Sequence, residues 1–197
     1  NEQRNRVRRI VVDALGDLPP RPSPPRVRTL SIEPKDGYKV EKFTFDNGVG
    51  YEVPGYIAIP AQRPGKSPAI LTMHGHSSSK ENMFGYQPTS QDVAALLAKH
   101  GYVVLGIDSY FNGERKGTGP AGNLETQDRG SDQEMSLFKL NLWLGRTLWG
   151  MMLRDEQIAL DYLVSRPEVD TSRIGAQGMS MGSTRAWWLG AIDDRIK

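Results

Sequence analysis

The fold of this chain is decided by Gly178-Met179-Ser180-Met181-Gly182. The pentapeptide fits G-x-S-x-G, which is typical of a sharp turn that exposes a serine between a strand and a helix. Propensity favours a strand over residues 173–177, and the apolar residues of 183–192 favour a helix after the turn. Glycine at 178 and 182 has a steric reason, because such a turn brings two backbone segments close together. A glycine-rich turn with an N-capping serine would also explain the pattern.

A second motif lies upstream, where the sequence reads Ile70-Leu71-Thr72-Met73-His74-Gly75-His76. It places a His-Gly pair at the end of a predicted buried strand. This position is where an α/β hydrolase places the loop that donates the second backbone N–H to the oxyanion. The two motifs therefore support each other.

The segments around these motifs predict an α/β protein. Strands are expected over 38–45, 51–59, 69–73 and 102–107, and helices over 91–99 and about 142–164. The strand-helix-strand order from 69 to 107 is the unit of a parallel sheet. Residues 111–135 have no clear period and predict a long connection.

The first 37 residues have a different composition. Apolar residues at helical spacing predict an amphipathic helix over 3–16, and the prolines of 18–25 predict a stiff connector. We therefore divide the chain into residues 1–37, a helix with a Pro-rich connector, and residues 38–197, the main domain. Seven arginines lie within residues 1–28. They are explained either by a solvated helix face or by a polyanion partner.

Composition excludes several classes of protein. The 197 residues contain no cysteine, so neither a disulfide framework nor a Cys-ligated zinc site is possible. The net charge of +2 comes from the arginine-rich start, and the remainder has no basic face for nucleic acid. No apolar run approaches the ~20 residues of a membrane span, and no signal-peptide pattern is present. Oligomeric state and compartment stay open, since absence of cysteine fits cytoplasm and periplasm equally.

Four stretches together resemble the dienelactone-hydrolase-like and acetyl xylan esterase branch of the α/β-hydrolase superfamily. They are His74-Gly75-His76, the strand and turn 106–115, Arg166-Pro167-Glu168-Val169-Asp170, and the pentapeptide around Ser180. The resemblance covers residues 38–197. It implies a three-layer fold, with a mostly parallel sheet and helices on both faces, of which this chain supplies the N-terminal portion.

The resemblance also implies a mechanism. Ser180 is the expected nucleophile, and the backbone N–H groups of His76 and Met181 are expected to form the oxyanion hole. The implied reaction is hydrolysis of a small carboxylic ester, such as an acetylated sugar, through an acyl-enzyme and without metal or cofactor. Two alternatives stay open: a serine peptidase of the same fold, and a non-catalytic protein that binds a ligand or partner.

The expected order of the catalytic residues is serine, acid, histidine, yet no histidine follows Ser180. One interpretation is that the acid and the histidine lie on a segment after Lys197 or on an associated fragment. The other is that His74, His76 or His100 is the base, because convergent triads occur in other chain orders.

Four further residues are candidates for the substrate pocket. Asp108, Glu114 and Arg115 follow a predicted strand at the end where open α/β sheets bind ligands. They either line the pocket or form internal ion pairs that fix the loop. The adjacent Trp187 and Trp188 cannot both face the core, so Trp187 is included among the pocket candidates.

Overall fold

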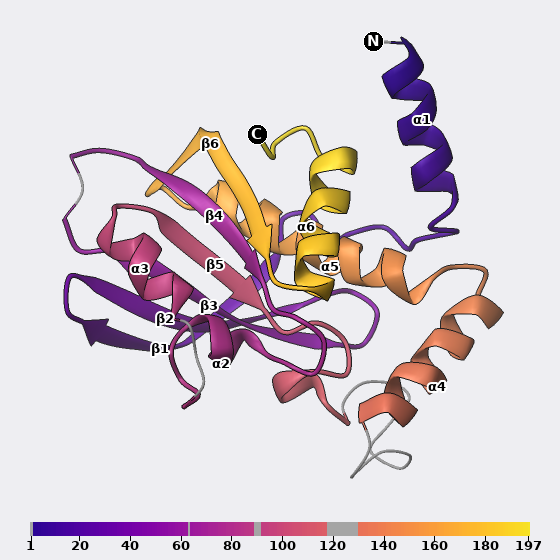
Figure 1. The fold of residues 1–197 in the computed structure, drawn as a ribbon, viewed down its shortest axis with the longest axis horizontal. Coiled ribbons are helices and arrows are strands. Elements are labelled where there is room, and N and C mark those ends of the chain that lie inside the picture. Colours follow the sequence, from indigo (N-terminus) through magenta and orange to yellow (C-terminus); the bar gives the residue numbers. More distant parts are fainter. Residues whose placement is uncertain (1, 63, 89–91, 118–129) are drawn as a thin grey trace.

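The computed structural model of this protein describes residues 2–62, 64–88, 92–117 and 130–197. Figure 1 shows these elements arranged around one sheet. The elements in chain order are α1 (Glu2–Asp13), β1 (Arg26–Lys35), β2 (Tyr38–Asp46), β3 (Glu52–Pro60), β4 (Ser67–Met73), α2 (Lys80–Met83), α3 (Val93–Lys99), β5 (Val103–Ile107), the 3₁₀ helix η1 (Gly113–Arg115), α4 (Gly130–Trp143), α5 (Leu148–Ser165), β6 (Val169–Gly178) and α6 (Met181–Ile192).

The six strands form one sheet in the order β1-β2-β3-β5-β4-β6. β1, β2 and β3 pair antiparallel, β3 pairs antiparallel with β5, and β4 pairs parallel with both β5 and β6. The expected α/β architecture with helices on both faces is confirmed. Over the described strands, however, the sheet is mixed rather than mostly parallel, because antiparallel strands precede the β4-α3-β5 unit.

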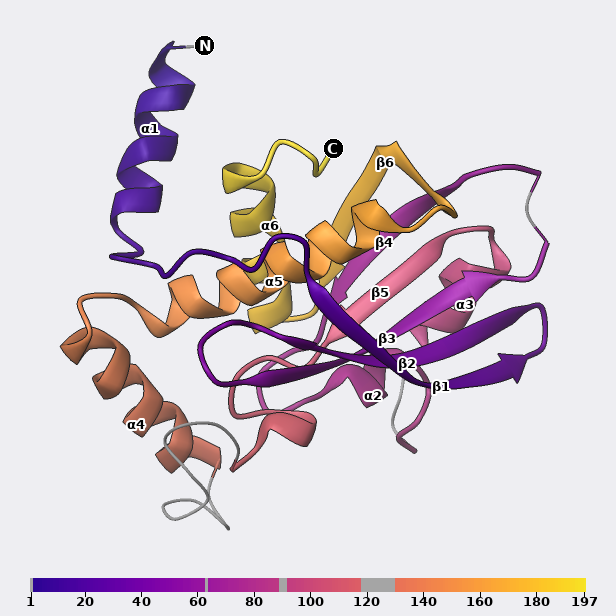
Figure 2. The same ribbon diagram turned by 180° about the vertical axis from the view of Figure 1, so that it is seen from behind.

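Each face of the sheet is covered by helices. On one face, α5 and α6 pack on strand residues such as Phe43, Leu71 and Leu105. On the other, α2 and α3 pack on Val40, Ala58 and Val104. Figure 2 shows α5 running along its face of the sheet. Successive side chains of a strand point to opposite faces of the sheet, so a sheet between two helical layers needs apolar residues on both faces.

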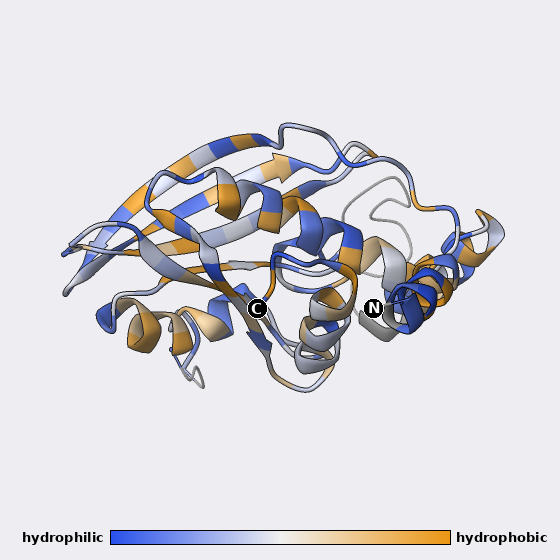
Figure 3. Ribbon diagram, turned by 90° about the horizontal axis from the view of Figure 1, so that it is seen from above, coloured by the Kyte–Doolittle hydropathy of each residue, from blue (hydrophilic) through white to orange (hydrophobic). Residues whose placement is uncertain are grey.

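Two helices extend beyond the sheet. Figure 1 shows α1 and α4 on the same side of the molecule, outside the region covered by the strands, and Figure 3 shows the N-terminal helix at that end from above. α1 is held to the C-terminal part by Arg8, whose guanidinium donates to Asp194 and to the carbonyl of Ala191. Within the ranges that the structure describes, no helix has the length and apolar character needed to cross a membrane.

Strand β1 corrects the interpretation of residues 1–37 as a helix and connector alone. It pairs with β2 along its length, so the hairpin crosses the 37/38 division. Charged residues occupy both of its faces, and almost all of its side chains are exposed. An edge strand of this kind lacks the alternation that identifies a half-buried strand. The prediction of a helix near 3–16 is confirmed, with its end at Asp13.

The single helix expected over 142–164 is wrong at its start. The structure has two helices, α4 and α5, separated by a turn in which Gly145 has φ 73°. α4 begins at Gly130, inside the segment that we interpreted as a connection. Residues 118–129 of that predicted connection lie outside the described residues. The expected strands near 38–45, 51–59, 69–73, 102–107 and 173–177 and helices near 91–99 and 183–192 are confirmed.

Candidate active site

Ser180 lies where the chain turns from β6 into α6. It is the N-cap residue of α6 with φ 51° and ψ −120°, a conformation that non-glycine residues rarely adopt. The side chain is exposed and its hydroxyl makes no capping hydrogen bond, so the N-cap explanation does not account for this serine. Strain of this kind is typical of functional turns.

The flanking glycines are required by close backbone contacts. A Cβ built at Gly182 would lie 2.1 Å from the carbonyl oxygen of Met73, and one at Gly178 would lie 2.4 Å from the carbonyl carbon of Gly182. Real Cβ atoms do not approach backbone atoms so closely. The steric reason predicted for glycine at both positions therefore holds in the structure.

The His74-Gly75-His76 turn lies beside Ser180 because of strand register. β4 and β6 are parallel neighbours in which Met73 pairs with Gly178, so the two strands end side by side in the sheet. A Cβ on Gly75 would lie 3.7 Å from Cβ of Ser180. The backbone N–H groups of His76 and Met181 have no hydrogen-bond partner among the described residues. The turn and the first residue of α6 thus offer two unused donors near the serine.

His74 is buried and both of its ring nitrogens are engaged. Nε2 lies 3.0 Å from the backbone nitrogen of Ser109, and Nδ1 lies 2.8 Å from the carbonyl oxygen of Gly75. Burial, together with the nearby charge of Arg185, lowers the pKa of His74 to about 3. A ring in this state cannot accept a proton from Ser180, which removes His74 from the candidate bases.

The two other histidines differ in position. His100 lies between α3 and the start of β5, at the amino-terminal ends of the parallel strands, whereas Ser180 lies at their carboxyl ends. Its Nδ1 contacts the carbonyl of Leu96. His76 is half exposed beside the turn, with Nε2 2.7 Å from a carboxylate oxygen of Glu134 on α4. Only His76 therefore remains a candidate base within the chain.

A buried ion pair lies beneath the His74-Gly75-His76 turn and the turn that carries Ser180. Arg185 of α6 pairs with Glu156 of α5, and its Nη2 donates to the carbonyl oxygen of His74 at 2.6 Å. Burial raises the pKa of Glu156 to about 7, against the opposing charge of Arg185. Sequence reasoning missed this pair. An arginine five residues after Ser180 was the only available signal, and its partner is 29 residues away.

Asp108 lies in the interior, where it pairs with a buried lysine. The residue is fully buried and accepts hydrogen bonds from Nζ of Lys80 at 2.7 Å and from the backbone N–H groups of Lys80 and Glu114. The carboxylate of Glu114 forms ion pairs with Nζ of Lys80 at 2.6 Å and with Nζ of Lys42 at 2.9 Å. The structure thus favours the internal ion pair over the pocket for these residues. Burial raises the pKa of Asp108, and the charge of Lys80 opposes that change.

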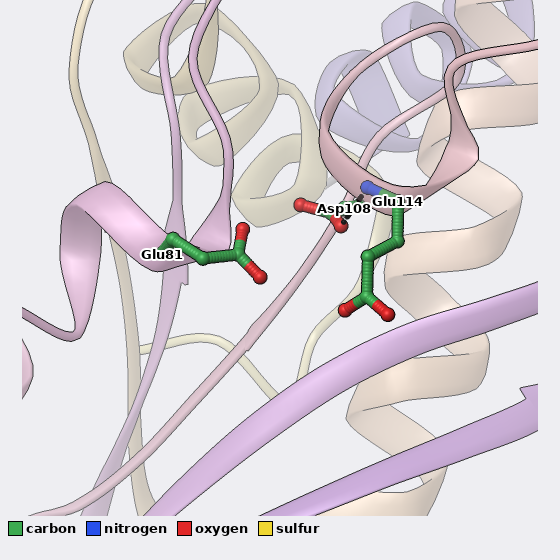
Figure 4. A group of neighbouring side chains, drawn as sticks. All are labelled: Glu81, Asp108 and Glu114. Carbon is green, nitrogen blue, oxygen red and sulfur yellow. Dashed lines mark hydrogen bonds between the residues drawn. The ribbon is translucent and has the colours of Figure 1, made fainter. Parts of the chain in front are cut away.

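Figure 4 shows Glu81, Asp108 and Glu114 directed toward a common space, as in a metal site. Their oxygens lie within 4.8 Å of one another. Nζ of Lys80 lies 2.6 to 2.7 Å from all three carboxylates. Because the ammonium group already supplies the positive charge, the donor set does not fit a cation.

Arg115 and Trp187 also differ from the expectation. Arg115 is buried, lies 2.9 Å from Asp155 and stacks with its Cζ 3.9 Å from the ring centroid of Tyr110. Trp187 is 60% exposed and packs on Trp188, with ring centroids 5.5 Å apart. Neither residue is among those that line the cavity beside His76. The internal ion pair that we weighed for Arg115 is the arrangement present.

A cavity beside the His74-Gly75-His76 turn has a volume of about 560 Å³. It is lined by His76, Ser77, Ser78, Ser79, Asn82, Gln87, Phe111, Asn112, Gly113 and Lys116. It opens at the carboxyl ends of β4 and β5, where open α/β sheets bind ligands. Ser77 and Phe111 both have positive φ, at 55° and 53°. The cavity is polar, so it suits a substrate with hydroxyl groups.

Comparison with known proteins places these features in context. A family model described as the Abhydrolase family matches residues 1–197. YtaP of Bacillus subtilis (strain 168), provisionally named a hydrolase, is 36% identical over 189 residues, which cover 93% of this chain and 58% of YtaP. A Yersinia pestis protein provisionally named a carboxymethylenebutenolidase is 26% identical over 155 residues, covering 75% of this chain and 47% of that protein.

Among solved structures, a Bacteroides fragilis protein provisionally named an acetyl xylan esterase has a TM-score of 0.83 and 22% identity. The match covers 99% of this chain and 51% of that protein. The chain spans about half the length of the relatives it matches.

Proposed function

The chain belongs to the Abhydrolase family, and from this premise we propose that it is part of a serine hydrolase that cleaves small carboxylic esters through an acyl-enzyme. The observation that carries the proposal is the environment of Ser180. An exposed hydroxyl on a strained turn stands beside two backbone N–H groups, those of His76 and Met181, that have no partner in the part of the chain that the structure describes. Such donors stabilise the oxyanion of a tetrahedral intermediate.

In the proposed reaction, Oγ of Ser180 attacks the ester carbonyl and the N–H groups of His76 and Met181 bind the developing oxyanion. A base removes the hydroxyl proton and returns it to the departing alcohol. Water then attacks the acyl-enzyme, releases the acid and restores the serine. We place the base and its carboxylate partner on a segment beyond these residues, because His74 and His100 are not available to Ser180 and Nε2 of His76 already contacts Glu134.

The substrate class follows from the cavity and the relatives. The polar lining beside His76 suits a hydroxylated alcohol, and a structural relative is named for its action on acetylated xylan. We therefore propose acetylated sugars as substrates. The competing peptidase function predicts faster cleavage of an aminoacyl nitroanilide than of a nitrophenyl ester.

Active-site labelling tests the proposal. The full-length protein is treated with a fluorophosphonate probe and assayed with nitrophenyl acetate. We expect rapid labelling, complete loss of label in Ser180→Ala, and a fall in ester hydrolysis of several orders of magnitude. Ser183→Ala is the matched control, since the hydroxyl of Ser183 is exposed and donates to the carbonyl of Ser180.

The outcomes separate the competing functions. If Ser183→Ala lost the label and Ser180→Ala kept it, the nucleophile would be Ser183, and the proposed role of Ser180 would be wrong. A folded full-length protein that neither labels nor hydrolyses esters would favour the non-catalytic binding protein.

A further inference from the structure

The Gly75–His76 peptide bond carries the proposed oxyanion donor on one side and a fixed carbonyl on the other. Its carbonyl oxygen belongs to Gly75 and lies 2.8 Å from Nδ1 of His74, while its N–H belongs to His76. The contact therefore acts on the peptide group whose N–H is proposed to bind the oxyanion.

The hydrogen bonds of His74 determine its tautomer. The backbone N–H of Ser109 can only donate, so Nε2, at 3.0 Å from it, must be the unprotonated nitrogen. The ring proton is then on Nδ1 and is donated to the carbonyl of Gly75. The low pKa of this buried ring agrees with a neutral imidazole. One acceptor and one donor are thus satisfied in a single arrangement.

The direction of the peptide follows from its geometry. Cis peptide bonds in the described chain are confined to Ser23–Pro24, so Gly75–His76 is trans and its C=O and N–H point in opposite directions. The His74 ring is 1% exposed and draws the carbonyl inward. The N–H of His76 consequently points away from the interior, on the side where Ser180 is exposed. Arg185 holds the preceding carbonyl, that of His74.

We infer that His74 is a positioning residue, whose Nδ1–H fixes the Gly75–His76 peptide so that the N–H of His76 faces the oxyanion. The inference rests on the proposed function and adds a role to a histidine that cannot be its base. An oxyanion donor must be oriented before the reaction, because reorganisation during the reaction would cancel its benefit. Without the Nδ1–H, the peptide can rotate and lose that orientation.

Two substitutions of similar size separate this role from simple packing. In His74→Asn, the side-chain amide occupies the place of Nδ1 and can still donate to Gly75. In His74→Gln, the amide reaches the place of Nε2, so it can accept from Ser109 but leaves the carbonyl of Gly75 unbound. For the full-length protein acting on nitrophenyl acetate, we expect kcat to fall 10- to 100-fold in His74→Gln and only a few-fold in His74→Asn. KM should change little in both.

The results distinguish failure of the inference from failure of the proposed function. A parent protein without ester hydrolysis overturns both. An active parent in which the two variants lose kcat equally, or in which KM rises instead, overturns the role of His74 alone. Thermal unfolding of each variant confirms that it is folded. If His74→Gln does not fold, His74→Ala, which leaves room for water on Ser109, must show the same loss of kcat.

Discussion

At the scale of single residues, backbone strain is concentrated around the candidate site. Four non-glycine residues of the described chain have positive φ, namely Ser77, Asp92, Phe111 and Ser180. Ser77 and Phe111 line the cavity that includes His76, and Ser180 stands on the neighbouring turn. Strained residues persist where the surrounding structure holds them, which is typical of ligand and catalytic sites.

The glycines of the turn allow a direct test of this packing. In Gly182→Ala, the new Cβ would lie 2.1 Å from the carbonyl oxygen of Met73, so α6 and β4 must move apart. We expect a loss of about 3 kcal/mol in the free energy of unfolding, together with loss of ester hydrolysis. The control is Gly190→Ala in the same helix, where the nearest atom is 3.6 Å from the added Cβ. It should be neutral or stabilising by up to about 1 kcal/mol. Denaturant unfolding of both variants measures the difference, and equal stabilities would contradict the contact.

The residues of the turn were predictable and those behind it were not. Ser180, Gly178 and Gly182 form a local motif whose steric logic is contained in five consecutive residues. Lys80, Glu156 and Arg185 act through partners that are 28 or 29 residues distant in sequence. Their role depends on which groups the fold brings together, and charged residues are normally expected at the surface.

At the scale of elements, Lys80 connects α2 to the loop after β5. Its ammonium group is buried among Asp108, Glu81 and Glu114. In Lys80→Met, the carboxylate of Asp108 stays buried without its cation, and the free energy of unfolding should fall by about 3 to 5 kcal/mol. Lys99→Met is the control, because Lys99 and Asp36 form an exposed pair whose loss should cost less than about 1 kcal/mol. A Lys80→Met protein as stable as the control would show that Lys80 does not hold this loop.

Elements with a buried face were predicted well, and elements without one were not. β4 contains the apolar run Ala69-Ile70-Leu71 and β5 is apolar throughout, and short apolar runs between turn residues are typical of buried strands. β1 has no buried face, so its pattern resembles that of a polar connector. α4 also exposes apolar side chains, among them Phe138 and Trp143. Periodicity reports burial, and it gives little information where a strand or helix projects into solvent.

At the scale of the whole molecule, the sheet order explains why two motifs about a hundred residues apart form one site. β4 and β6 are neighbours, and the parallel register Met73–Gly178 brings both of their carboxyl ends to one edge. The sequence motifs predicted a common site, but not this register. Nor could they show that β5 and its loop bury Asp108 and Arg115 rather than present them to a substrate.

The placement of the histidines leads to a prediction for the chain as a whole. Residues 1–197 contain three histidines. Both ring nitrogens of His74 are hydrogen-bonded, and Nε2 of His76 contacts Glu134. His100 lies at the amino-terminal ends of the parallel strands, away from Ser180 at their carboxyl ends. Neither His74 nor His100 is placed to activate Ser180, since a serine hydroxyl needs a base that can accept its proton, and the interpretation that we favour puts this base outside residues 1–197. We therefore expect residues 1–197, expressed alone, to hydrolyse nitrophenyl acetate no faster than their own Ser180→Ala variant.

The same assay with His76→Ala decides between the two sources of the base. If the 197-residue chain is active and His76→Ala abolishes that activity while leaving the fold intact, His76 is the base and no additional segment is needed. If the chain is inactive and the full-length protein is active, the base lies outside these residues. In that case, His76→Ala in the full-length protein should retain most of its activity, because the proposed oxyanion donor is the backbone N–H, which alanine also provides.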